Sequence, residues 1–190
     1  MTTDAITIHR VVGDTLTPIS VVLANANGDP VSLSGKTVTF ELYDTDSVAA
    51  YTASSADISS EVTQAFTATA NSVFLSCVGH RLKVGQQILL TTTGTLPAGL
   101  ATSTRYFVRK SAANHFTLST MADGDVITPT SAGTGTHSFA VVGQTQWAPT
   151  SGAVDTAGTF YGCFRVTSGG AVDTFPGNEK RLKIVLEARP

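Results

Sequence analysis

The stretch QWAPTSGAVDTAGTFYGCFRV, residues 146–166, decides the fold class. It is typical of a strand, a glycine-bearing turn and a second strand. The segment that would complete this structure, GDTLTPISVVLANANGDPVSLSGKTVTFEL, ends at Leu42, about a hundred residues earlier. A separate segment therefore stands between the two halves of one β structure.

Strand alternation dominates the sequence, and helical periodicity is nearly absent. In TVTFELY, Val38, Phe40 and Leu42 share one face, which is typical of a half-buried antiparallel strand. Apolar residues alternate in the same way in TFYGCFRVT (159–167) and KRLKIVLEA (180–188). Each such face needs an apolar layer opposite it, so we predict an all-β fold with two packed sheets.

The middle of the chain, residues 62–142, consists of short strand-like runs separated by turns rich in Gly, Thr and Ser. Such a segment predicts a small β-barrel or roll of its own. Residues 1–61 and 143–190 together have about the length of an immunoglobulin-like β-sandwich. We therefore predict a discontinuous sandwich with an inserted β domain, in which Glu61 and Gly143 are neighbours in space. The strands predicted in the insert are 72–77, 86–92, 104–110, 114–119 and 136–142.

The charge balance limits the possible partners. The formal net charge is −2, and only 14% of the residues are charged. Nucleic acids and anionic membranes require a basic patch, so neither is an expected partner. The N-terminal MTTDAITIHRVV lacks the pattern of a secretory signal. Cys77 and Cys163 are expected to be thiols in a protein folded in a reducing cytoplasm, with a disulfide between them as the less favoured alternative.

Five motifs of the flanking segments resemble one known family. They are G-D-T-L-x-P-I (Gly13 to Ile19), N-G-x-P-V-x-L-x-G (Asn27 to Gly35), W-x-P (Trp147 to Pro149), T-A-G-T-x-Y (Thr156 to Tyr161) and T-F-P (Thr174 to Pro176). Together they resemble the immunoglobulin-like N-terminal domain of phage upper-baseplate proteins, and similar domains recur in other virion proteins of bacteriophages and prophages. The middle segment, with GQQILLTTTGTLPAGLATSTRYFV and ANHFTLST, is similar to a module of phage tail and fibre proteins. The resemblance implies a virion building block rather than the complete baseplate protein, which continues into regions that bind the receptor-binding protein.

No motif specifies an enzyme. PVSLSGKT approaches a phosphate-binding loop, but Pro30 replaces its first glycine and the following TVTFEL alternates as a strand. The chain has no G-x-S-x-G elbow, and His9, His80, His115 and His137 stand in unrelated contexts. Both His115 and His137 are expected to face outward from strands. We predict no catalytic residue, and two carboxylates converging in a deep pocket would reverse that prediction.

Two groups of residues have spacings that suggest metal ligands. Cys77 and His80 form a C-x-x-H pair, but two ligands do not make a structural zinc site, so packing and solvation are the favoured explanation. Asp44, Asp46 and Asp57 supply too few oxygens for calcium, and a polar loop is favoured. We therefore predict neither a metal ion nor a cofactor.

Five apolar or aromatic residues are candidate contact residues. Trp147, the only tryptophan, is favoured as a core or rim residue, with an exposed partner-binding aromatic as the alternative. Leu96, Pro97 and Leu100 form an apolar loop tip that either tucks over its own barrel or projects into a neighbour. Tyr106 completes the set as an aromatic of the insert.

The sequence as a whole favours a non-enzymatic bacteriophage virion protein. It is expected to act through contacts with copies of itself and with capsid, connector, tail or baseplate proteins, after assembly in the bacterial cytoplasm. A capsid decoration or accessory role is favoured. The alternative is a carbohydrate-binding or host-adhesion module of a phage tail, with Tyr51, Tyr106 or Trp147 stacking on a sugar ring.

Overall fold

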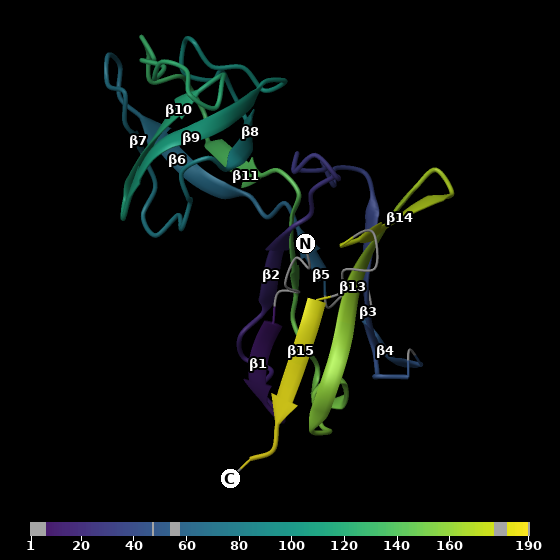
Figure 1. Ribbon diagram of the computed structural model, residues 1–190. Coiled ribbons are helices and arrows are strands. Elements are labelled where there is room, and N and C mark those ends of the chain that lie inside the picture. The colour runs from purple at the N-terminus through teal and green to yellow at the C-terminus, as the bar shows by residue number, and fades with distance from the viewer. Residues whose placement is uncertain (1–6, 47, 54–57, 177–181, 190) are drawn as a thin grey trace. The chain divides into compact units, whose positions relative to one another are not determined.

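The computed structural model, shown in Figure 1, describes four ranges of the chain: 7–46, 48–53, 58–176 and 182–189. Within these ranges the chain forms strands, turns and one short 3-10 helix, η2 (Ser151–Ala153), so the predicted all-β class is confirmed. The chain divides into two compact units. We call Met1–Ser60 with Gly143–Pro190 the framework unit and Glu61–Val142 the barrel unit.

The framework unit contains two β-sheets. The larger sheet has the order β1-β15-β13-β3-β4, and β14 pairs with β13. Its strands β1 and β15 are parallel, and its other pairs are antiparallel. The smaller sheet is antiparallel, in the order β2-β12-β5. The strands of the unit are β1 (Thr7–Val11), β2 (Ile19–Val22), β3 (Thr37–Tyr43), β4 (Ala49–Thr52), β5 (Ile58–Ser60), β12 (Gln144–Trp147), β13 (Gly158–Ser168), β14 (Ala171–Phe175) and β15 (Leu182–Glu187).

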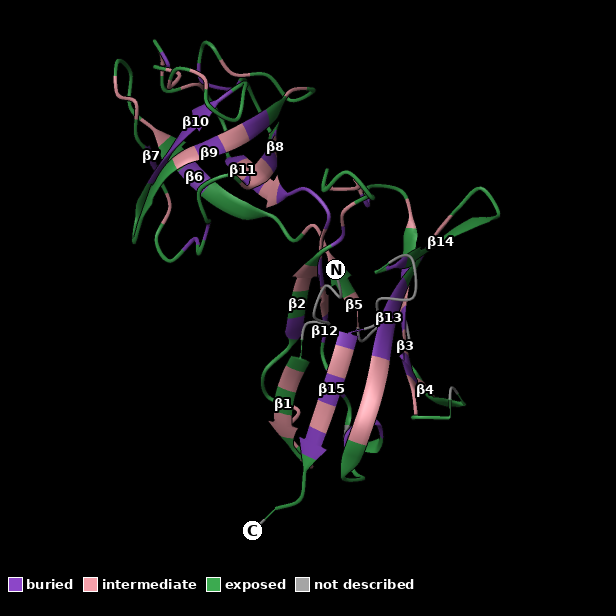
Figure 2. Cartoon of the chain, in the orientation of Figure 1, coloured by how far each residue is buried: buried purple, intermediate pink, exposed green. Residues whose placement is uncertain are grey.

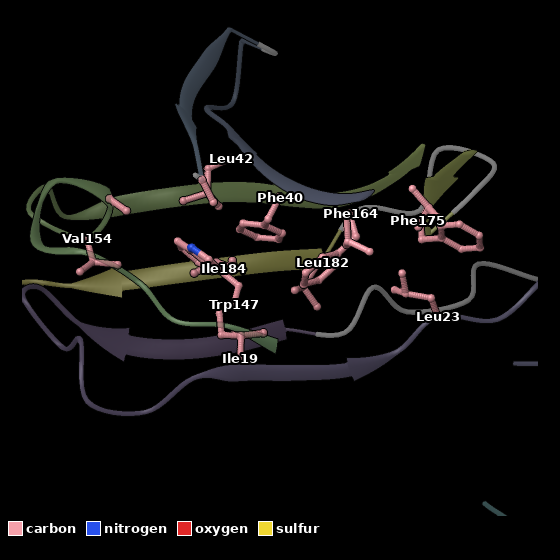
Figure 3. Close-up of a cluster of buried hydrophobic side chains, with 14 of the residues drawn as sticks. Ile19, Leu23, Phe40, Leu42, Trp147, Val154, Phe164, Phe175, Leu182 and Ile184 are labelled. Carbon is pink, nitrogen blue, oxygen red and sulfur yellow. The ribbon is translucent and has the colours of Figure 1, made fainter. Parts of the chain in front are cut away.

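One apolar core lies between the two sheets, as the side chains in Figure 3 show. Phe40 of β3 and Trp147 of β12 come from opposite sheets, are fully buried and stack with ring centroids 4.3 Å apart. Phe164 of β13 lies 4.7 Å from Phe40, also between ring centroids. Burial alternates along β15, as Figure 2 shows. The framework unit is therefore sandwich-like, and the predicted packing of two sheets is confirmed.

Gly162 on β13 leaves room for this aromatic core. A Cβ atom at Gly162 would lie 2.5 Å from Cζ and 2.8 Å from Cε2 of Phe40, and 3.4 Å from Cδ1 of Ile184. Carbon atoms pack best at about 3.5–4.0 Å, so a side chain here would collide with the phenyl ring. The absence of a side chain lets Phe40 lie directly against the backbone of β13.

A tight turn follows β2. The strand ends at Val22, and Ala24 forms an isolated bridge with Pro30. The Oδ1 atom of Asn25 accepts hydrogen bonds of 2.9 Å from two of the following backbone amides. Gly28 has φ 88°, which a residue without a side chain adopts readily. These features form the tight turn of NANGDP, residues 25–30.

The barrel unit is a closed antiparallel barrel with the order β10-β7-β6-β11-β8-β9. Its own core includes Phe66, Phe116 and Phe139, whose ring centroids lie 5.2 to 6.4 Å apart. Tyr106 is part of the same core, and its hydroxyl accepts a hydrogen bond of 2.8 Å from the amide of Ala101. The strands are β6 (Gln64–Ala68), β7 (Leu75–Ser76), β8 (Gln87–Thr92), β9 (Arg105–Ala112), β10 (His115–Ser119) and β11 (His137–Val141).

The sequence predicted five strands in this segment and missed β6. Only one residue of β6, Phe66, is buried, so the strand has no alternation that a short window could detect. The strand predicted at 72–77 forms only at Leu75–Ser76. The other predicted strands correspond to β8, β9, β10 and β11, with small differences at their ends.

In each unit, the two strands that lead to the unit boundary are hydrogen-bonded neighbours. In the framework unit β5 pairs with β12, and Ser60 lies opposite Thr145. In the barrel unit β6 pairs with β11, and Gln64 lies opposite Phe139. The chain therefore leaves and re-enters each unit on adjacent strands.

Candidate functional site

Most of the residues proposed as contacts from the sequence lie inside the protein. Trp147 is 0% exposed, Tyr106 2% and Leu96 8%, and Pro97 is also buried. Leu100 is half-buried and packs against the same barrel core as Leu96. The apolar loop tip therefore tucks over its own barrel, and the alternative of a projecting tip is wrong. As contact residues these were poor candidates, because their apolar surface is already buried within the chain.

Two histidines are buried, which corrects one prediction. His137 is 5% exposed rather than outward-facing, whereas His115 is exposed as predicted. A carbonyl only accepts hydrogen bonds, so Nε2 of His137 donates to the carbonyl of Ala132 at 3.0 Å. Its Nδ1 then accepts from the hydroxyl of Thr92 at 2.9 Å. His137 thus ties the segment before β11 to β8.

The C-x-x-H pair organises a turn of the barrel unit. His80 is 5% exposed, its Nδ1 accepts from the amide of Leu82 at 3.0 Å, and its Nε2 donates to the carbonyl of His115 at 3.3 Å. The thiol of Cys77 lies 3.9 Å from the carbonyl of Val78, and burial raises its pKa. In the described part of the chain, no three His, Cys, Asp or Glu side chains gather in a way that could hold a metal ion. Both ring nitrogens of His80 are therefore engaged in holding the turn.

The acidic loop after β3 also has a local structural role. Oδ1 of Asp44 accepts hydrogen bonds from the amides of Asp46 (3.0 Å) and Val48 (2.8 Å). This is the side-chain turn that aspartate commonly forms, and it agrees with the predicted polar loop. Asp57 lies outside the described residues. Gly35, with φ 70°, turns the chain into strand β3, so the segment resembling a phosphate-binding loop opens no helix.

A polar group lies on the outer face of the larger framework sheet. Nη1 of Arg165 is 2.9 Å from Oε1 of Glu41, and the hydroxyl of Tyr43 donates to Oε2 of the same carboxylate. Burial alone would raise the pKa of Glu41, but the hydrogen bonds from Tyr43 and Arg165 outweigh it and lower that pKa. The bond to Glu41, aided by burial, raises the pKa of Tyr43 to about 12. These side chains satisfy one another, which is typical of a structural group.

A groove of about 600 Å³ opens in the side of the barrel unit. This volume lies in the range of about 300–1,000 Å³ that is usual for ligand pockets. No Asp, Glu, Lys or Arg contributes to its lining. The lining residues come from three stretches of the chain: 65–68, 76–78 and 132–137.

The groove arises where β11 separates from β6. The β6–β11 ladder ends at the pair Phe66 and His137, and beyond it the last two residues of β6 pair with β7. Segment 132–136 turns away to the other side, where Thr134 and Thr95 exchange backbone hydrogen bonds of 2.8 and 3.1 Å. The walls of the groove are therefore two stretches of backbone that have stopped pairing with each other. Sequence reasoning missed this site, because no residue pattern marks the point at which two strands diverge.

Fold and groove together define an all-β protein with two separate cores and, in its barrel unit, a groove lined without Asp, Glu, Lys or Arg. Comparison with known protein families, curated proteins and solved structures finds no match. Within the described residues, no helix has the length and apolar character needed to cross a membrane.

Proposed function

We propose that this chain is a non-enzymatic structural protein of a bacteriophage virion. It acts through contacts between symmetric copies and with capsid, connector, tail or baseplate proteins, after assembly in the bacterial cytoplasm. The framework unit is an immunoglobulin-like sandwich in this proposal, and the barrel unit is a domain inserted into it. The motifs that resemble phage baseplate and tail modules support this assignment.

The open edges of the framework sheets carry the proposal. Among the described strands, β1, β4 and β14 have only one neighbour in the larger sheet, and β2 and β5 have only one in the smaller sheet. Strand β4 has the sequence AAYT, without a charged side chain, and three of its four residues are exposed. Proteins that must remain separate usually protect such edges with charges or bulges. The β3–β4 register shifts between Leu42 and Tyr43, but β4 carries no charged side chain, so it can still pair with a strand of a neighbour. Repetition in a symmetric particle then turns weak contacts into firm attachment.

The polar side chains support a structural role rather than a catalytic one. Glu41, Tyr43 and Arg165 are hydrogen-bonded to one another on the outside of a sheet. In the groove, His137 has both ring nitrogens engaged by neighbouring groups. The carbohydrate-binding alternative loses two of its three candidate aromatics, Tyr106 and Trp147, because both are buried. The third, Tyr51, is half-buried, and its hydroxyl lies 3.0 Å from that of Thr150.

The decisive experiment uses particles of the phage or prophage that encodes the chain. After banding in a density gradient, quantitative mass spectrometry counts the copies per particle and a gold-labelled antibody locates them. We expect a fixed copy number and one location on the particle. A chain present in the lysate but absent from banded particles would contradict the proposal.

Edge pairing is tested by placing a charge on β4. We expect Ala50→Lys to reduce incorporation into particles, because a charged edge resists pairing. The matched control is Ser168→Lys, an exposed position on β13, whose strand already has a neighbour on each side. Equal incorporation of both variants would show that the β4 edge makes no contact in the particle.

The inserted architecture is tested by excision. Residues 62–142 are removed, and Glu61 is joined to Gly143 through a short glycine linker. We expect the remainder to unfold cooperatively and to keep Trp147 in an apolar environment, because the framework core contains no residue of the barrel unit. Loss of all β signal in circular dichroism would count against an insertion.

A further inference from the structure

We propose that the groove of the barrel unit binds an extended, uncharged strand of another protein. The bound strand lies between β6 and segment 132–136 and fills the gap in the barrel wall. This site does not depend on a virion location, and its test is independent of the particle experiments.

Backbone groups on both walls of the groove favour a polypeptide as the occupant. Beyond Phe66, the end of β6 has β7 as a neighbour on one edge and the groove on the other. In segment 132–136, Thr134 and Thr136 direct backbone groups to the 93–95 stretch. The amides and carbonyls of Gly133 and Gly135 make no hydrogen bond to any other described residue. A strand in the gap supplies donors and acceptors to both walls, which is the mode of recognition called β-augmentation.

The residues that line the groove favour uncharged side chains on the bound strand. Because the groove contains no Asp, Glu, Lys or Arg, a charged side chain entering it would lose water without gaining a partner. Val78 lies at the groove and is 85% exposed, so it offers an apolar side chain to an occupant. Alternating small polar and aliphatic residues match these walls, because successive side chains of a strand point to opposite faces.

Segment 132–136 is fixed before any partner binds. A Cβ atom at Gly133 would lie 2.5 Å from the carbonyl oxygen of Thr95, and one at Gly135 would lie 2.8 Å from the amide of Gly94. Both glycines have positive φ angles, 74° and 79°, so the segment depends on glycine for its path. A part-buried hydrogen bond from the ring of His137 to the carbonyl of Ala132 also anchors the segment. A wall that is already ordered loses little conformational entropy on binding, which favours affinity.

The described strands of a second copy do not fit this gap. Each of them is already hydrogen-bonded within a sheet or the barrel. A strand attached to its own sheet along one edge cannot enter a space that is bounded by backbone on both sides. In this proposal the occupant is a segment of a different protein that does not already belong to a sheet.

The test uses the full chain and a capped peptide of about seven residues that alternates Thr and Val, about 23 Å long when extended. Backbone amide resonances are followed by NMR during titration. We expect shifts confined to 65–68, 76–78 and 132–137, and slower hydrogen exchange at the amides of Gly133 and Gly135. The control peptide has the same sequence with alternate amides N-methylated, and we expect it to bind at least about tenfold more weakly because it cannot complete the ladder.

Two charged variants test the position of the site. We expect Thr67→Glu and Val78→Glu, both exposed in the groove, to weaken peptide binding about tenfold or more. The matched controls Thr91→Glu and Val84→Glu are exposed barrel positions outside the groove, and we expect them to bind within about twofold of the wild type. The amide spectrum of each free variant shows whether the barrel is folded. Two groove variants are used so that the test still stands if one of them fails to fold.

Four results would overturn the proposal. They are equal binding of the N-methylated peptide, shifts located elsewhere, no shift at peptide concentrations up to about 1 mM, and equal effects of groove and control substitutions. Self-association of the free chain through the same amides would also overturn it, because the occupant would then be a second copy. These results are independent of the particle experiment, so the groove proposal can fail while the proposed virion function stands, and the reverse.

Discussion

Replacing Gly162 by alanine tests how tightly the framework core is packed. The added methyl group would lie 2.5 Å from Cζ of Phe40, so the ring must withdraw by about 1 Å to reach normal contact. Withdrawal is opposed because Trp147 stacks on Phe40 at 4.3 Å and Phe164 lies at 4.7 Å, and all three rings are buried. We therefore expect a loss of stability rather than a simple rotation of the ring.

The expected magnitude combines two opposing effects. Overfilling a well-packed core by a methyl group costs about 1–3 kcal/mol. Alanine restricts the unfolded chain more than glycine does, which returns about 0.4–1 kcal/mol. We expect Gly162→Ala to lower the free energy of unfolding of the framework unit by about 1–2 kcal/mol.

The assay is equilibrium unfolding in urea, followed by tryptophan fluorescence. Trp147 is the only tryptophan and belongs to the framework core, so its emission reports on that unit. The control is Gly152→Ala, where a Cβ atom meets nothing within 4 Å and φ is not positive. We expect this control to stay within about 0.5 kcal/mol of the wild type.

A rescue experiment connects the effect to the phenyl ring. In a Phe40→Leu background, Gly162→Ala should cost clearly less than in the wild type, because the atoms that collide with the methyl group are gone. The reasoning is refuted if Gly162→Ala is as stable as the wild type, if the Gly152 control loses as much, or if the cost is unchanged in the Phe40→Leu background.

Three further predictions concern single side chains. Phe116→Ala should destabilise the barrel unit by about 3–5 kcal/mol, as measured by circular dichroism. The urea midpoint from Trp147 emission should stay constant, because Trp147 lies in the other core. An equal shift of that midpoint would contradict separate cores. His80→Ala should cost the barrel unit about 1–3 kcal/mol and speed hydrogen exchange at the Leu82 amide, which loses its acceptor; unchanged exchange would argue against that hydrogen bond. The pKa of Tyr43 is raised, so its stabilising effect is complete below the unfolded-state pKa of about 10 and is lost as pH rises to about 12. Urea midpoints of Tyr43→Phe should therefore fall less across this window than those of the wild type, and parallel declines would count against the assigned pKa.

Strands β3 and β15 of the framework unit were predictable because they are long enough to show alternation. In β3 and β15, buried and less buried residues alternate over six or seven positions, and the sequence predicted the correct face in both. Trp147 ends a strand whose other residues are polar, so its place in the core follows from its own large apolar ring rather than from alternation. Local periodicity was sufficient to predict the buried face of a strand wherever only one of its faces packs against a core.

The barrel unit shows where local patterns fail. Strand β6 buries only Phe66, so its membership in the barrel is decided by pairing with residues about seventy positions later. His137 looked like an outward-facing strand residue, but segment 132–136 folds back and its Ala132 carbonyl binds the ring. The groove depends on the same long-range path. Such features follow from how distant segments meet, which no short window of sequence contains.

The adjacent strands at the unit boundary have an evolutionary consequence. The chain leaves the framework unit after Ser60 and returns to it near Thr145, which lies opposite Ser60 in the sheet. The barrel unit begins and ends on the neighbouring strands β6 and β11. A gene fragment that encodes such a self-closing body can be gained, lost or exchanged without changing the register of the host sheets. Recombination can therefore join the same framework unit to a different module, and the same barrel unit to a different framework.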